Sequence, residues 1–148
     1  MLELSGLAVP FNGRCWASPS RGEEVSFAPG CFTYAIRGGA VSAWLNHDAG
    51  RVLGRQSDGS LRLWESEDGL CFALTIRGGA DEALLRRVAR EGLLTGCSCG
   101  WNNWQSFARA RCGSGTVIEL FETALYEISI LIAPHKPANW GTSVSISR

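Results

Sequence analysis

Short apolar runs separated by glycine constrain the fold of this chain more than any other feature of its sequence. Glycine occupies 18 of the 148 positions, well above its usual share of about 7%. Between the glycines, the runs either alternate apolar and polar residues or are solidly apolar, and each has the length of a strand. They are residues 2–9, 40–45, 60–64, 70–76, 116–121 and 124–133. The sequence therefore predicts a mainly β fold.

Two segments depart from this strand pattern. In residues 81–91, leucine, valine and alanine recur at helical spacing, with Asp81 placed to cap the start and Gly92 to end the segment. Residues 31–37 carry one short apolar face and predict a second, shorter helix. No repeat, low-complexity tract or linker divides the chain. We expect one domain, a β-rich barrel or sandwich surrounded by a few helices, over residues 1–138, followed by a Ser/Thr-rich C-terminal tail over 139–148.

Charge and hydropathy exclude several classes of function. Lysine and arginine total 14, as do aspartate and glutamate, so the formal net charge is +0. No global field draws such a chain to nucleic acid or to an anionic membrane surface, and we expect neither as a partner. No run approaches the ~20 apolar residues of a membrane span. Residues 1–6 lack the basic and apolar regions of a signal peptide, so we expect the protein to stay in the cytosol.

The six cysteines are expected to be reduced thiols, because the chain shows no export signal. Cys15, Cys31 and Cys71 are interpreted as small buried apolar residues. The other three, together with His47 or His135, offer a zinc site as an alternative. A Cys-x-Cys pair followed by one distant cysteine is not the spacing of a known zinc finger, however, so we expect no metal and no cofactor. These three are Cys97, Cys99 and Cys112.

A Gly-x-Ser-x-Gly pattern at residues 96–100 is the most conspicuous candidate for a reactive site. In α/β-hydrolases this pattern lies on a turn from strand to helix, whereas here a helix precedes it and a strand follows, which disfavours that family. If the segment is a strand, Ser98 shares a face with the two glycines, and the two cysteines lie on the other face. Missing side chains on both sides let a substrate approach the hydroxyl. The alternative is a structural serine at a strand bend.

A nucleophilic serine needs a base and a group that orients that base. His47 lies where an apolar strand turns polar, which suits a general base as well as a plain turn residue. His135, in a proline-flanked loop, is expected to be a solvated surface group. Glu127 is the one charge in an apolar strand, so it needs a partner, either the imidazole or a structural arginine. Asp48, adjacent to His47, cannot easily reach back to the same ring and is assigned a supporting position.

Several blocks, in this order along the chain, resemble the prohead protease family of tailed bacteriophages, whose fold is similar to that of the herpesvirus assemblins. The most specific block is residues 127–138, which match the family's closing E-V-S-L-V-x-x-P-x-x-P-A. Residues 27–32 match its F-x-P-G-A-F with Cys31 in place of alanine, and residues 98–101 match its S-I-G-F with Cys99 and Trp101 as departures. The matching blocks are residues 6–11, 27–32, 46–55, 69–70, 98–101 and 127–138.

The resemblance implies a serine endopeptidase with an assemblin-like β-barrel. Such an enzyme cleaves scaffold, or the scaffolding segment of the major capsid protein, during prohead maturation, often with self-cleavage. It works in the host cytoplasm, inside the immature capsid, and the relation to assemblins permits a homo-oligomer. Carried over residue by residue, Ser98 is the nucleophile, His47 the general base and Glu127 the third catalytic residue.

Two further points stay open at the level of the sequence. The oxyanion hole has candidates in the backbone amides near Ser98 and in the side chains of Arg109 and Arg111. The cysteine-rich serine block also leaves room for an alternative, a catalytically inactive capsid or scaffold component that retains the protease barrel. The two readings differ in whether the side chains of Ser98 and His47 can meet.

Overall fold

The computed structural model describes residues 1–113, 115–139 and 141–147, and within them the side chains of all residues except 17–19, 103–107 and 109–112. The side chains of Arg109, Arg111 and Cys112, considered above, therefore lie outside the described residues. The described part of the chain is mainly β, as the glycine-punctuated pattern predicts.

The described residues form ten strands, two α-helices and two short 3-10 helices. In chain order they are β1 (Leu2–Pro10), β2 (Arg14–Ser18), η1 (Pro19–Arg21), β3 (Glu23–Phe27), α1 (Thr33–Gly38), β4 (Ser42–Leu45), β5 (Asp48–Arg55), η2 (Gln56–Asp58), β6 (Leu61–Glu65), β7 (Gly69–Ile76), α2 (Gly79–Arg90), β8 (Leu94–Cys112), β9 (Gly115–Ile132) and β10 (Ser145–Ser147).

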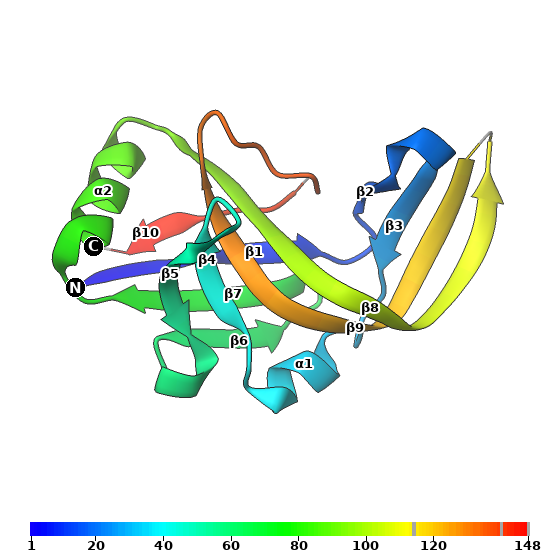
Figure 1. Ribbon diagram of the computed structural model, residues 1–148, viewed down its shortest axis with the longest axis horizontal. Helices are drawn as coiled ribbons and strands as arrows, with labels where there is room; N and C mark the ends of the chain where they lie inside the picture. Colours follow the sequence, from blue (N-terminus) through cyan, green and yellow to red (C-terminus); the bar gives the residue numbers. More distant parts are fainter. Residues whose placement is uncertain (114, 140, 148) are drawn as a thin grey trace.

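The strands pair into two sheets. The smaller has the order β10-β1-β7-β6, and its neighbours run antiparallel. The larger is built on β9, which pairs antiparallel with β8 along one side. Along its other side, β9 pairs in parallel first with β3 and then with β4, and these carry β2 and β5. Figure 1 shows the long β8–β9 hairpin crossing the molecule, with both chain termini near α2.

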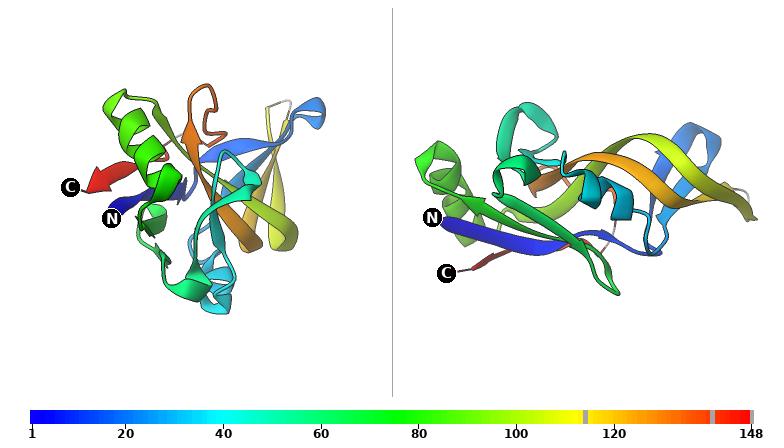
Figure 2. Two further views of the ribbon diagram at one scale, coloured as in Figure 1. Left: turned by 60° about the vertical axis from the view of Figure 1, so that its left-hand side comes forward. Right: turned by 90° about the horizontal axis from the view of Figure 1, so that it is seen from below.

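The core lies between the two sheets, which Figure 2 shows as separate layers, β1 and β7 on one side and the β8–β9 hairpin on the other. Phe72 from the small sheet and Ile118 from β9 are fully buried. Leu85 and Val88 fix one face of α2 on this core, each contributing about 1.5–3 kcal/mol by burial. An aromatic group continues the core toward the middle of β8, where the Phe27 ring lies 5.2 Å from that of Trp101 in an edge-to-face contact.

Several strand predictions need correction. The runs 116–121 and 124–133 are parts of a single strand, β9, because the ladder with β8 continues through the polar residues between them. Four strands, β2, β3, β5 and β10, were not predicted. β3 and β10 pair with strands distant in the chain, whereas β2 and β5 pair with the neighbouring strands β3 and β4. The described strands form two sheets and no closed barrel, so the predicted barrel is not confirmed.

Both predicted helices exist, with shifted starts. The α2 helix begins at Gly79, two residues before Asp81, and the Glu82 carboxylate accepts a hydrogen bond from the Gly78 N–H at 2.6 Å. The predicted cap at Asp81 is wrong, because that carboxylate is paired with Arg51 instead. Near α1, the Glu65 carboxylate of β6 accepts hydrogen bonds from the N–H groups that precede the helix, those of Gly30 at 3.0 Å and Phe32 at 2.8 Å.

The segment that we set apart as a C-terminal tail is packed against the domain. Its last described residues form β10, which pairs with β1. The Ser143 N–H donates to the Leu7 carbonyl at 3.0 Å. Among the cysteines expected to be buried, Cys15 and Cys31 are, but Cys71 is partly exposed near the turn before β7.

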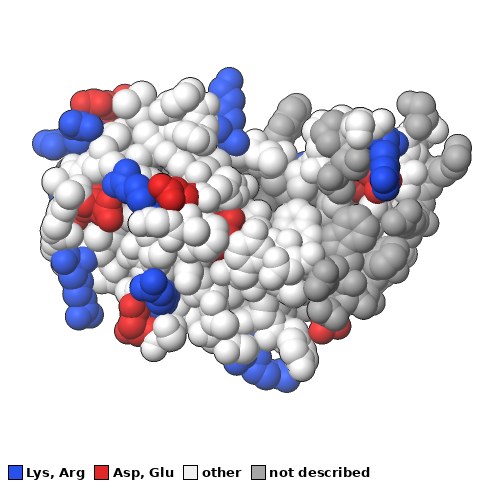
Figure 3. All heavy atoms as spheres, viewed as in Figure 1, with Lys and Arg blue, Asp and Glu red and all other residues white. Residues whose placement is uncertain are grey.

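Charges of both signs are interspersed over the face shown in Figure 3, in keeping with the zero net charge. Among the ion pairs of the described residues, Arg86 and Glu82 lie 2.8 Å apart, and Arg14 and Glu24 lie 3.6 Å apart. Neither α1 nor α2, the two α-helices in the described part of the chain, has the length and apolar character needed to cross a membrane.

Candidate active site

His47 is held in an uncommon backbone conformation at the turn between β4 and β5. Leu45 pairs with Asp48, so Asn46 and His47 form a two-residue hairpin loop. Their φ angles are 51° and 61°, and two successive positive values are the mark of a type I′ turn. A left-handed residue other than glycine costs on the order of 1–3 kcal/mol, and it persists only where its surroundings hold it.

The hydrogen bonds that hold this turn come from β9. The Asn46 N–H donates to the Ile130 carbonyl at 3.0 Å, and the Asn46 side-chain oxygen accepts from the Ile132 N–H at 2.9 Å. The His47 N–H donates to the Ser129 hydroxyl oxygen at 3.0 Å. The first of these bonds continues the backbone pairing of β4 with β9, and the two bonds to side chains fix His47 beside β9.

The imidazole of His47 meets the Glu127 carboxylate. His47 Nδ1 lies 2.6 Å from Glu127 Oε1, and the Ser129 hydroxyl donates to Glu127 Oε2 at 2.7 Å. Glu127 is 1% exposed while the His47 side chain is 44% exposed. Both carboxylate oxygens are thus hydrogen-bonded, which a buried charge requires. Of the two partners considered for Glu127, imidazole or arginine, the structure has the imidazole.

This pairing also sets the electrostatics of the ring. The hydrogen bond to Glu127 and the charge of that carboxylate raise the pKa of His47 above its ordinary value of 6.5, and partial burial opposes them. With Nδ1–H donated to the carboxylate, the other ring nitrogen, Nε2, is the proton acceptor of the neutral imidazole. Its partly exposed edge is therefore equipped to take up a proton.

Ser98 lies on the strand next to Glu127. In the antiparallel ladder Ser98 pairs with Ser129, and Gly100 pairs with Glu127, so these four residues share one face of the sheet. Because β4, β9 and β8 are neighbours, the turn with His47, the carboxylate of Glu127 and the hydroxyl of Ser98 come from three adjacent strands.

A cavity of about 200 Å³ contains both Ser98 and His47 in its lining. The Ser98 side chain is partly buried, and no hydrogen bond joins its hydroxyl to His47 or to another described group. The rest of the lining is largely apolar and includes one polar side chain, Asn139. The lining residues are Ala8, Val9, Cys15, Trp16, Phe27, His47, Ser98, Cys99, Trp101, Ala138 and Asn139.

The two glycines that flank Ser98 make room for the protein's own groups, which corrects the expectation that they leave gaps for a substrate. A Cβ at Gly100 would lie 2.8 Å from Glu127 Oε1 and 2.7 Å from the Tyr126 ring. A Cβ at Gly96 would lie 2.6 Å from the Thr142 hydroxyl. Gly100 therefore admits the carboxylate, and Gly96 admits the chain that follows β9.

The cysteines beside Ser98 are not activated nucleophiles. Cys97 is buried with its sulfur 3.6 Å from the Ser143 carbonyl oxygen, and Cys99 lines the cavity. Burial raises the pKa of both thiols above its usual value, and it raises that of Cys15 to about 11. A cysteine nucleophile needs the opposite, a lowered pKa.

The other predicted candidates lie apart from this centre. Asp48 is exposed, and its carboxylate accepts from the Gly50 N–H at 2.8 Å rather than contacting the imidazole. His135 is exposed, as expected for its loop. Among the side chains that the structure describes, no three potential ligands gather for a metal ion. Cys112, part of the zinc alternative, lies outside those side chains.

Two polar residues of this region were missed by the analysis of the sequence. Ser129 connects Glu127 to the backbone of His47, and Asn139 lines the cavity. Ser129 had a usable signal, a hydroxyl two positions after a buried carboxylate in an apolar strand and so on its face. Asn139 had none, because its position depends on how the chain returns after β9.

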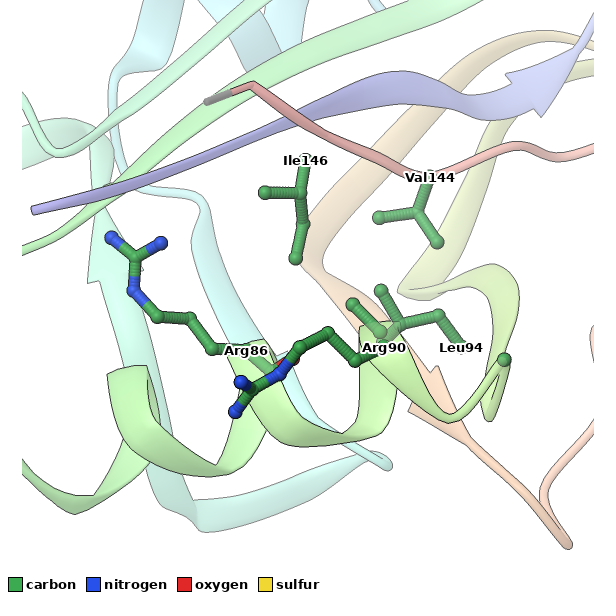
Figure 4. Close-up of a pocket in the computed structure, with 7 residues that line it drawn as sticks. Arg86, Arg90, Leu94, Val144 and Ile146 are labelled. Atoms are coloured by element: carbon green, nitrogen blue, oxygen red, sulfur yellow. The ribbon is translucent and has the colours of Figure 1, made fainter.

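A larger groove of about 750 Å³ lies elsewhere, between α2 and β10 (Figure 4). Val144 and Ile146 face Arg90 and Leu94 across it. Its other charged lining residue, Arg86, is engaged with Glu82 and with the Met1 carbonyl. None of the residues predicted for catalysis lines this groove.

A serine hydrolase uses a serine hydroxyl and an imidazole that a carboxylate orients. Here such an imidazole and a serine hydroxyl line one cavity. The chain belongs to the caudovirus prohead serine protease family, whose model matches residues 2–148. Comparison with curated proteins and with solved structures gave no match. Membership of this family implies a serine protease of capsid maturation, which acts on capsid protein within the phage prohead.

Proposed function

We propose that the protein is a serine endopeptidase in which Ser98 is the nucleophile, His47 the general base and Glu127 the residue that orients the imidazole. The observation that carries this proposal is the 2.6 Å contact between His47 Nδ1 and the buried Glu127 carboxylate, beside a cavity that Ser98 also lines. Family membership supports the reaction class, and the geometry supports the assignment of roles.

In the proposed reaction, Ser98 Oγ attacks the carbonyl carbon of the scissile peptide while its proton passes to His47 Nε2. Glu127 stabilises the imidazolium that forms. When the tetrahedral intermediate collapses, the C–N bond breaks and His47 returns the proton to the leaving amine. A water molecule, deprotonated by the same imidazole, then hydrolyses the acyl-serine, releasing a carboxylic acid and restoring the Ser98 hydroxyl.

The hydroxyl of Ser98 and the imidazole of His47 are not hydrogen-bonded to each other. Ser98 has no hydrogen-bond partner among the described groups, and contacts of this kind commonly tighten only when substrate binds. The ring of His47, by contrast, is already fixed by Glu127 and its backbone by Ser129. Substrate binding then has to bring Ser98 Oγ within hydrogen-bond reach of His47 Nε2.

The proposed substrates are scaffold or the scaffolding segment of the major capsid protein, with self-cleavage of the protease. The apolar lining around Ser98, including Val9 and Trp101, favours a small apolar side chain next to the scissile bond. A second cavity, of about 330 Å³, shares Cys15, Trp16 and Ala138 with the first and continues it toward Arg14 and Glu24. An extended polypeptide suits two such cavities in a row. We also propose that the fold is assemblin-like and that the protein acts as a homo-oligomer.

The test uses the phage's own major capsid protein precursor as substrate. Wild-type protein should shorten the precursor, and Ser98→Ala and His47→Ala should each leave it intact. Ser66→Ala, which removes an exposed hydroxyl at a turn that lines neither cavity, should cleave like the wild type. Cleavage by the Ser98→Ala protein would overturn the proposal. A wild-type protein that assembles with the precursor without cutting it would instead indicate an inactive capsid component.

A further inference from the structure

Asn139 has the only buried side-chain polar atoms without a hydrogen-bond partner in the described part of the chain. Its side chain is 7% exposed, and both its oxygen Oδ1 and its nitrogen Nδ2 lack partners. Buried polar groups are nearly always hydrogen-bonded, because desolvation without compensation destabilises the fold. A carboxamide left in this state indicates a function that outweighs its cost.

The position of Asn139 is set by close packing. Oδ1 lies against Gly13, where a Cβ would come within 2.5 Å of it. The chain on either side is also fixed, because Pro137 packs against Gly96 and the Thr142 hydroxyl accepts from the Cys97 N–H at 3.2 Å. The backbone that carries Asn139 is therefore fixed. Because both polar atoms are fully covered, the carboxamide has to turn toward the cavity when it pairs with a ligand.

The cavity that Asn139 lines is the one that contains Ser98 and His47, and most of its remaining lining is apolar. A carboxamide offers two N–H donors and one carbonyl acceptor. This set matches the C=O and N–H groups of a peptide unit, whereas a purely apolar ligand would leave both atoms unpaired. The cavity thus provides apolar surface for a side chain, and the turned carboxamide adds one donor and one acceptor for a main chain.

We infer that Asn139 is a substrate-binding residue, whose carboxamide pairs with a main-chain peptide group of the polypeptide bound beside Ser98. The inference rests on the proposed function, because it supplies the polypeptide. The two hydrogen bonds exist only in the complex, so the deficit in the free protein is relieved on binding and contributes to the selection of an extended peptide.

The experiment separates binding of the main chain from chemistry at Ser98. The substrate is the internally quenched peptide that the wild type cleaves fastest from a mixed library, and the second probe is a small fluorophosphonate, which reacts with the serine and has no peptide group. Asn139→Leu keeps the approximate size of the side chain and removes both polar atoms. It should lower kcat/KM for the peptide about 10- to 100-fold. The fluorophosphonate rate should stay within about twofold, and the Tm should rise, because an unpaired amide has left the core.

Asn102→Leu is the matched control, since it makes the same change at an exposed position of β8 and should leave kcat/KM unchanged. Asn139→Ala is measured in parallel in case leucine does not fit, and the same loss of kcat/KM is expected. Unchanged kcat/KM in a folded Asn139 variant would overturn the inference. The inference would also be overturned if the fluorophosphonate rate fell by the same factor as kcat/KM and the Tm fell as well, since this would indicate a structural role. If the wild type neither cleaves nor reacts, the proposed function itself has failed.

Discussion

Replacing Glu127 by glutamine tests how the buried carboxylate controls His47. The change keeps the size of the side chain and removes the charge that contacts Nδ1 at 2.6 Å. A hydrogen bond to a charged group is worth about 1.5–3 kcal/mol and a neutral one about 0.5–1.5 kcal/mol, so about 1–1.5 kcal/mol is lost. The His47 side chain is 44% exposed, and solvent screening keeps the figure from being larger. The pKa of His47 should therefore fall.

The direction of the pH effect follows from the role of the base. Only neutral His47 accepts the serine proton, so wild-type kcat/KM should rise with pH through a pKa above 6.5. In Glu127→Gln this acid limb should move to lower pH, because the raising influences are gone and burial, which lowers the pKa, remains. The plateau should fall about 10²- to 10⁴-fold, since the imidazole loses its charge partner and its fixed tautomer.

The assay is kcat/KM between pH 5 and 9, with an NMR titration of the imidazole in the free protein as an independent measure. Glu67→Gln, at an exposed turn position, serves as the control. An acid limb that stays in place or moves upward, or a plateau within twofold of the wild type, would refute the reasoning. The stability of the wild-type fold should also depend on pH through His47. The raised pKa of His47 stabilises the wild-type fold below about pH 6.5, and this stabilisation is lost as pH rises through the raised value.

Three further substitutions test neighbouring contacts. Ser129→Ala removes the hydroxyl that joins Glu127 Oε2 to the His47 backbone, and should lower kcat/KM about 10- to 100-fold in steady-state assays of a folded variant. Gly100→Ala places a Cβ 2.8 Å from Glu127 Oε1, and should destabilise by about 1–3 kcal/mol in urea titrations; Gly38→Ala, where nothing lies within 4 Å of the new Cβ, should not. Glu65→Ala removes the acceptor of the N–H groups before α1, and should cost about 1–2 kcal/mol in the same titrations.

Local patterns predicted the elements of the fold better than their pairing. The helix over residues 81–91 is visible in its spacing, but its true start depends on the Glu82 carboxylate meeting the Gly78 N–H, an alternative to the cap at Asp81 that spacing cannot distinguish. The strand β5 carries charges and two glycines and has little strand pattern of its own. It forms because β4 pairs with it and is itself paired with β9.

The same contrast holds at the site. A lone charge in an apolar strand has to find a partner, and this physical demand made Glu127 a candidate, with an imidazole or an arginine as its partner. The resemblance to the family then favoured His47. Nothing in the sequence around Asn139 indicates that its side chain is buried. Its burial arises from the packing of Gly13, Pro137 and Gly96, which are far apart in the chain. Functional groups that are placed by non-local packing need the structure to be found.

The central claim, that Ser98 is the nucleophile activated by His47, is tested most directly by mapping a fluorophosphonate adduct by mass spectrometry. We predict a single adduct on Ser98 in the wild type and a rate at least about 100-fold slower in His47→Ala. We predict no adduct on the sulfur atom of Cys97 or Cys99. An adduct on Cys99, or a rate at Ser98 that does not depend on His47, would contradict the central claim.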